Sequence, residues 1–91
     1  MIVHKNIRVE GVVQGVWYRD STKKKALELG LMGYVMNKSD KSVFIEVEGK
    51  EDLVDELILW CHSGSSKAIV SNVIVNDGNL VPFSLFEIHY D

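Results

Sequence analysis

Residues 31–48, Leu-Met-Gly-Tyr-Val-Met-Asn-Lys-Ser-Asp-Lys-Ser-Val-Phe-Ile-Glu-Val-Glu, carry the pattern that decides the fold. Side chains in residues 31–37 and in residues 43–48 fall into two alternating sets, which is the period of a strand with one buried face. Residues 38–42 are polar and typical of a tight turn. The segment therefore predicts a β-hairpin.

Helical patterns lie on both sides of this hairpin. Before it, Asp20, Ser21 and Thr22 offer side-chain acceptors suited to a helix start, and the helix is predicted to run to Leu29 and to stop at Gly30. After it, residues 52–62 carry an apolar stripe at helical spacing, formed by Leu53, Val54, Leu57, Ile58 and Cys61.

Three more strands are predicted further out, over residues 3–10, 69–75 and 83–90. The order is β-α-β-β-α-β with a short extra C-terminal strand. Each strand offers one apolar face, so two helices on one face of an antiparallel sheet would close the structure. We predict an α/β (α+β) fold of the ferredoxin-like sandwich type, in a single domain over residues 1–91.

Composition limits the classes of function. The net charge of −3 argues against a general nucleic-acid binder, which usually carries a basic surface. Cys61 is the only cysteine and the three histidines are scattered, so we expect no disulfide and no metal site. No apolar run approaches the ~20 residues that span a bilayer, and the N-terminus lacks the pattern of a signal peptide. A cytoplasmic protein without membrane contact is expected.

The loop from Gly11 to Arg19, Gly-Val-Val-Gln-Gly-Val-Trp-Tyr-Arg, follows the first predicted strand. Glycines that bracket a loop allow several main-chain amides to face one anion, and an arginine adds a planar fork of donors. One interpretation is a phosphate pocket closed by Arg19. The other is an ordinary turn whose arginine pairs with a surface carboxylate.

Asn37 ends the second predicted strand, where it can approach this loop. Its side chain has one acceptor and two donors, so it can hold and aim a water molecule but cannot act as a base. The alternative is a turn-forming asparagine at a hairpin corner.

Together these residues resemble a known family. Gly11 to Arg19 resembles the first signature of the acylphosphatases, and Gly33-Tyr34-Val35-Met36-Asn37, followed by Asp40 and Val43, resembles the second. Val47-Glu48-Gly49, Trp60…Gly64…Ala68-Ile69-Val70 and Phe86-Glu87-Ile88 extend the resemblance over most of the chain.

The resemblance implies hydrolysis of the carboxyl-phosphate bond of small acyl phosphates. Main-chain amides and one guanidinium can stabilise the phosphoryl charge without a metal, so we expect metal-independent chemistry and no cofactor. A monomer is also expected. The resemblance also implies that Arg19 binds the phosphoryl oxygens and that Asn37 orients the attacking water. The loop amides would bind the same oxygens, through Gln14, Gly15, Val16, Trp17, Tyr18 and Arg19. The alternative is a non-catalytic ferredoxin-like module that binds a small anion or a protein.

Two positions depart from the family pattern. Lys41 follows Asp40 where the family usually has glycine, and Ser65 follows Gly64 where the family commonly has proline. We expect both to affect stability or loop order rather than chemistry. Trp17 and Tyr18 could both flank an acyl group, but we expect one of them in the core. His4, His62 and His89 are expected to be structural or exposed.

Overall fold

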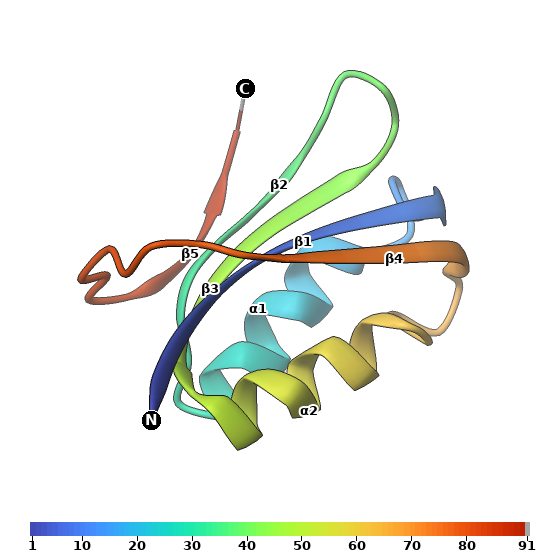
Figure 1. Ribbon diagram of the computed structural model, residues 1–91. Helices are drawn as coiled ribbons and strands as arrows, with labels where there is room; N and C mark the ends of the chain where they lie inside the picture. Colours follow the sequence, from blue (N-terminus) through green and yellow to red (C-terminus); the bar gives the residue numbers. More distant parts are fainter. Residues whose placement is uncertain (91) are drawn as a thin grey trace.

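The computed structural model describes residues 1–90 and contains seven elements of secondary structure (Figure 1). In chain order they are β1 (Ile2–Val12), α1 (Tyr18–Glu28), β2 (Met32–Asn37), β3 (Val43–Lys50), α2 (Glu51–Cys61), β4 (Ile69–Asp77) and β5 (Phe86–His89). The predicted order of elements is confirmed. The last strand is shorter than the predicted 83–90, because residues 78–85 form a connection that precedes it.

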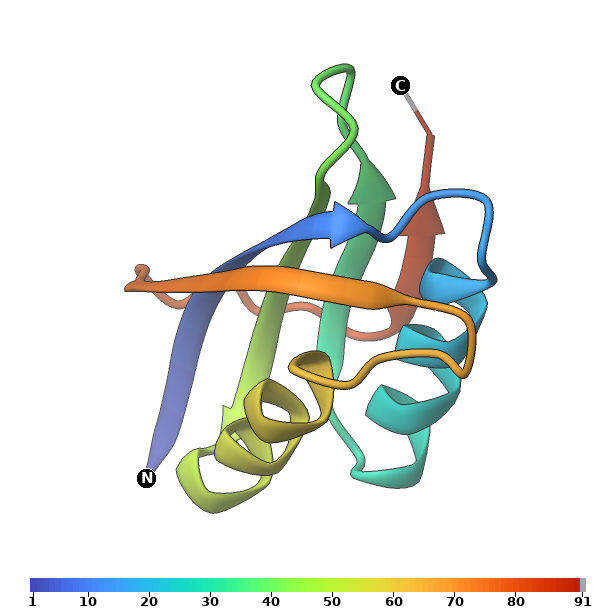
Figure 2. The same cartoon turned by 90° about the vertical axis from the view of Figure 1, so that its right-hand side faces the viewer.

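The five strands form one sheet in the order β4-β1-β3-β2-β5. The β1–β3, β1–β4 and β2–β3 pairs are antiparallel, as predicted, whereas β5 lies parallel to β2 at one edge. Both helices cover the same face of the sheet (Figure 2). The ferredoxin-like α/β sandwich predicted from the sequence is therefore confirmed.

The hydrophobic core lies between this face and the two helices. The stripe predicted on α2 places Val54, Leu57 and Cys61 fully inside, and α1 contributes Ala26. From the sheet, the buried apolar side chains are Ile7, Val9, Val35, Val43, Ile45, Val47 and Phe86. Burying one such aliphatic side chain contributes roughly 1.5–3 kcal/mol, so the strand alternation and the helix stripe together account for the layered structure.

Helix α1 begins earlier than the sequence predicted. Its first residue is Tyr18, and the expected caps at Asp20, Ser21 and Thr22 lie within the helix, where no side chain caps the N-terminus. Trp17 adopts a left-handed conformation with φ of 63° and reverses the chain into the helix. Tyr18 is buried, and its hydroxyl donates a 2.8 Å hydrogen bond to the carbonyl oxygen of Cys61. This bond connects the first turn of α1 to the end of α2. The prediction failed because a tertiary contact, rather than a side-chain cap, sets this helix start.

The loop between β1 and α1 is shorter than its glycines suggest. Gly11 lies inside β1 at a shift of the β1–β4 register, and a Cβ there would sit 2.2 Å from the Ile69 carbonyl oxygen. Gly11 therefore permits close packing of two strands rather than bracketing the loop. Gly15 lies within the loop itself and has a φ of +73°, the positive φ expected of a loop glycine.

Candidate active site

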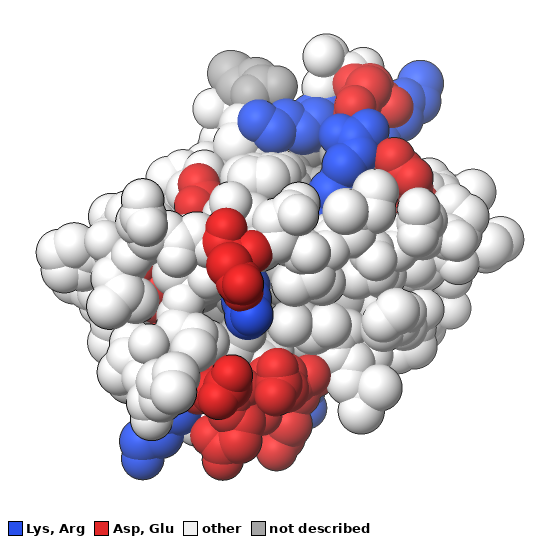
Figure 3. Space-filling view, in the orientation of Figure 1, with Lys and Arg blue, Asp and Glu red and all other residues white. Residues whose placement is uncertain are grey.

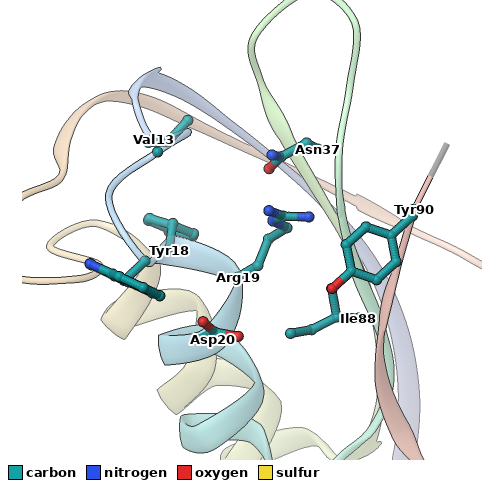
Figure 4. Close-up of a pocket in the computed structure, with 9 residues that line it drawn as sticks. Val13, Tyr18, Arg19, Asp20, Asn37, Ile88 and Tyr90 are labelled. Carbon is teal, nitrogen blue, oxygen red and sulfur yellow. The ribbon is translucent and has the colours of Figure 1, made fainter.

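A pocket of about 270 Å³ opens where the β1–α1 loop faces the ends of β2 and β5 (Figure 4). It brings Arg19 and Asn37 together, although they belong to different signature segments. The pocket is lined by Val13, Gly15, Trp17, Tyr18, Arg19, Asp20, Asn37, Ile88 and Tyr90. Of the predicted site residues, Gly15, Trp17, Tyr18, Arg19 and Asn37 line this cavity. Gln14 and Val16 are not among its lining residues.

The loop amides are available for a ligand. Within residues 1–90, the main-chain N–H groups of residues 14–19 donate to no protein acceptor, and the first helical bond of α1 runs from the Ser21 amide to the Trp17 carbonyl. Unpaired donors at a helix N-terminus, together with the helix dipole, favour a bound anion. The structure thus offers several donors in the segment that the sequence singled out.

Arg19 extends from the first turn of α1 into the centre of the pocket, toward Asn37 (Figure 4). The neighbouring carboxylate of Asp20 is directed away from it (Figure 4). None of the ion pairs among residues 1–90 involves Arg19, so the alternative of a surface ion pair finds no support there. Within the same residues its five donors make no hydrogen bond, so they can serve oxygens in the pocket.

Asn37 ends β2 and lines the same pocket. Its side-chain oxygen Oδ1 is buried and has no hydrogen-bond partner within the described part of the chain. A buried acceptor without a partner costs about 1–3 kcal/mol, and such a group in a native protein calls for an explanation. A donor from the pocket, such as water, would satisfy it.

Gln14 connects the loop to the β2–β3 turn. Its side-chain nitrogen Nε2 donates to the carbonyl oxygens of Lys38 at 2.9 Å and of Ser42 at 2.8 Å. These side-chain donors are therefore occupied, so only the main-chain amide of Gln14 is available to a ligand. Since Lys38 follows Asn37 directly, the side-chain amide of Gln14 helps to set the position of Asn37 relative to the loop.

The β2–β3 turn is also held by its own polar groups. Asp40 accepts from the Ser42 hydroxyl at 2.6 Å and the Ser42 amide at 3.1 Å, and it pairs with Arg8 at 2.5 Å. Hydrogen bonds from Ser42 and then Arg8 hold the pKa of Asp40 far below its usual range. Lys41 takes a φ of +78° in this turn, the conformation that favours glycine.

The remaining loop residues divide between core and surface. Trp17 is 73 % exposed at the pocket, whereas Tyr18 is buried, and burial raises the pKa of its hydroxyl well above the usual range. One of the two aromatic residues thus lies in the core, as predicted. Val16 packs against the core, and its carbonyl accepts a 2.6 Å hydrogen bond from Ser65. The serine that replaces the family's proline therefore ties the loop after α2 to the β1–α1 loop.

Sequence reasoning missed four residues of the pocket, Val13, Asp20, Ile88 and Tyr90. Ile88 and Tyr90 arrive with β5, which pairs parallel to β2 with His89 opposite Met36. An alternating strand pattern at the end of the chain does not reveal which edge it joins. The parallel placement is a property of the whole sheet, and no local signal predicts it.

Charge is unevenly spread on the face seen in Figure 3. Lys and Arg side chains gather, with a few acidic ones, at the end that carries the β2–β3 turn, and acidic side chains gather where α2 begins (Figure 3). The turn contains Lys38 and Lys41, and α2 contains Glu51, Asp52, Asp55 and Glu56. An anionic substrate is attracted to an end with local positive charge even when the net charge is negative.

Within residues 1–90, no group of His, Cys, Asp and Glu side chains is arranged to hold a metal ion. No helix in that range is long and apolar enough to cross a membrane.

Comparison with known proteins identifies the family of this chain. The acylphosphatase family model matches residues 5–88. The acylphosphatase of Haloquadratum walsbyi is 49 % identical over 71 residues, which cover 78 % of this chain and 76 % of that protein. The chain therefore belongs to the acylphosphatase family, and the resemblance seen in the sequence is confirmed.

Solved structures support the same assignment. The acylphosphatase structure from Coxiella burnetii matches with a TM-score of 0.94 and 35 % identity, covering 97 % of this chain and 93 % of that one. The acylphosphatase structure from Bacillus subtilis matches with a TM-score of 0.94 and 31 % identity, covering 99 % of this chain and 100 % of that one. The architecture is thus that of acylphosphatases along the whole chain.

Proposed function

We propose that this protein is an acylphosphatase that hydrolyses the carboxyl-phosphate bond of small acyl phosphates to a carboxylate and inorganic phosphate. The observation that carries the proposal is the meeting of three kinds of group in one pocket. The first is the main chain of residues 14–19, whose amides are unpaired within residues 1–90 and of which Gly15, Trp17, Tyr18 and Arg19 line the pocket. The others are the Arg19 guanidinium and the Oδ1 of Asn37, which is unpartnered within the same residues.

The phosphoryl group is bound by the loop and by Arg19. The main-chain amides of Gln14, Gly15, Val16, Trp17, Tyr18 and Arg19 donate to its oxygens. The guanidinium of Arg19 adds a bidentate contact, which its planar fork allows. Donors fixed before the reaction stabilise the charge of the transition state without reorganising, an effect worth roughly 3–4 kcal/mol for a single donor.

Asn37 positions the attacking water by accepting a hydrogen bond from it at Oδ1. The water oxygen bonds to phosphorus, the bond from phosphorus to the acyl oxygen breaks, and the carboxylate leaves with the electron pair. The water proton passes to a phosphoryl oxygen of the substrate. Because the leaving group of a mixed anhydride is already a weak base, positioning and charge stabilisation are sufficient, and no protein acid or metal has to assist.

Hydrolysis of benzoyl phosphate in the presence of a chelator tests this function. We expect turnover by the wild-type protein and its loss in Arg19→Lys, because lysine keeps the charge but not the fork. An absence of turnover above buffer would instead favour the alternative, a ferredoxin-like module that binds small anions or proteins. Wild-type turnover in Arg19→Lys would contradict the bidentate role of Arg19.

We also infer that the enzyme works as a monomer in the cytoplasm. One copy of the chain is sufficient to form the pocket. The only cysteine, Cys61, is a buried free thiol, and its burial raises the thiol pKa to about 12. A thiol in this state is unreactive and compatible with a reducing compartment. Light scattering in solution tests the monomer, and cell fractionation tests the location.

A further inference from the structure

Tyr90 lines the pocket although it lies outside both signature segments. It lines the pocket with Arg19 and Asn37, and the same three residues also line a second, adjoining hollow of about 220 Å³. Tyr90 faces into the site from the β5 side (Figure 4). A residue shared by two adjoining hollows, together with both functional side chains, is placed to influence them.

The sheet explains why Tyr90 is there. In the parallel β2–β5 pair, Met36 lies opposite His89, so the next residues along the two strands, Asn37 and Tyr90, are neighbours across the edge of the sheet. The pairing of β5 with β2 thus places Tyr90 beside the end of β2. Arg19 reaches the same place from the first turn of α1.

The ring of Tyr90 contacts the guanidinium directly. The Cζ atom of Arg19 lies 5.2 Å from the ring centroid, within the range of a cation–π interaction. Tyr90 is 76 % exposed, so its ring contributes little to the core. Its hydroxyl makes no hydrogen bond within residues 1–90. Within residues 1–90, the contact with Arg19 is the only cation–π or aromatic contact of this ring.

We propose that Tyr90 is a positioning residue that holds the Arg19 guanidinium in the orientation that receives a phosphoryl group. This proposal rests on the proposed function, because it assigns Arg19 to phosphate binding. An arginine side chain has several rotatable bonds, and ordering it on ligand binding costs free energy. A ring that already restrains the guanidinium removes part of this cost, and a phenyl ring does so as well as a phenol.

Phosphate binding to the Tyr90 variants tests the proposal. Dissociation constants for inorganic phosphate are measured by calorimetry for Y90F, Y90L and the wild type. A cation–π contact at an exposed site is worth about 0.5–1 kcal/mol, so we expect Y90L to weaken phosphate binding about two- to fivefold. Y90F should bind within twofold of the wild type. L59A is the matched control, since Leu59 is 73 % exposed on α2 and does not line the pocket.

A second measurement separates positioning from a structural effect. The side-chain protons of Arg19 should show an upfield ring-current shift in NMR spectra of the wild type and Y90F, and Y90L should abolish the shift while the melting temperature stays unchanged. Unchanged phosphate affinity and unchanged Arg19 shifts in Y90L would overturn the proposal. Both readouts are independent of turnover, so an inactive wild-type protein would refute the proposed function without affecting this test.

Discussion

The side-chain amide of Gln14 lies 2.8 Å from the main-chain carbonyl oxygen of Ser42, and this contact joins the β1–α1 loop to the β2–β3 turn. The loop carries the amides and leads to Arg19, whereas the turn follows Asn37. One side chain thus bridges the two segments that the proposed chemistry needs in register. The side chain of Gln14 holds the two segments together, whereas its main-chain amide is proposed to donate to the ligand.

Gln14→Leu should impair turnover more than phosphate binding. The loss of two hydrogen bonds, to Lys38 and Ser42, should lower the free energy of unfolding by about 1–3 kcal/mol. Since Asn37 then loses its fixed distance from the loop, kcat for benzoyl phosphate should fall further than phosphate affinity. Urea unfolding and steady-state kinetics measure the two effects.

Gln14→Glu serves as the shape-matched comparison. It keeps the length of the side chain but presents carboxylate oxygens to two carbonyl oxygens, so it should be no better than Gln14→Leu. A Gln14→Glu protein with wild-type stability and kcat would contradict the bridging role.

Lys41→Gly should stabilise the protein. The φ of +78° at Lys41 is a conformation that costs a residue with a Cβ about 1–2 kcal/mol. Glycine removes this strain but gains entropy in the unfolded chain, so a net gain of about 0.5–1 kcal/mol is expected. For a domain of this size, a gain of about 1 kcal/mol corresponds to a rise in Tm of about 4–8 °C.

Lys41→Ala is the control for this prediction. Alanine shortens the side chain but keeps the Cβ that causes the strain, so its Tm should stay near that of the wild type. If alanine stabilises as much as glycine, the cause is the lysine side chain and not the backbone.

A buried histidine makes the stability of the fold depend on pH. On the helix-free face of the sheet, the ring nitrogens of His4 lie 2.7 Å from carboxylate oxygens of both Glu46 and Glu48. Burial lowers the pKa of His4, but the hydrogen bonds and charges of Glu48 and Glu46 outweigh it and raise the pKa above 6.5. Phe83, in the connection between β4 and β5, stacks on the ring with centroids 5.9 Å apart.

The raised pKa gives the direction of the pH dependence. The folded state binds the His4 proton more tightly than the unfolded state, so the stabilisation is complete below pH 6.5 and is lost as the pH rises through the folded pKa. We expect the free energy of unfolding of the wild type to decline over this window more than that of His4→Gln. His62→Gln, at an exposed histidine, is the control. An NMR titration that places the pKa of His4 at or below its usual value would contradict this account.

The sequence predicts the layers of this fold well, because each strand and helix carries its own periodic pattern. Val54, Leu57 and Cys61 are buried where helical spacing predicts. Arg19 and Asn37 were predicted from their residue types and from a resemblance to acylphosphatases, and they share a pocket because the order of the strands brings their elements together.

The features that the sequence did not predict depend on contacts between distant segments. The start of α1 is set by the buried Tyr18 and its hydrogen bond to Cys61, not by a local cap. The place of Tyr90 depends on the edge that β5 joins and on its parallel direction. In both cases, the deciding partner lies more than 40 residues away.

The roles of Arg19 and Asn37 differ in a way that one experiment separates. Both line the pocket, but only Arg19 is proposed to hold the phosphoryl group, whereas Asn37 is proposed to hold the water. Arg19→Ala should therefore lose phosphate binding together with turnover, which corresponds to roughly 3 kcal/mol or more of transition-state stabilisation.

The most direct measurement is the effect of Asn37→Ala on two quantities, kcat for benzoyl phosphate and the dissociation constant for inorganic phosphate. The proposed mechanism predicts that kcat collapses while phosphate still binds with close to wild-type affinity. A wild-type kcat, or a loss of phosphate affinity as large as the loss of kcat, would show that Asn37 does not orient the attacking water.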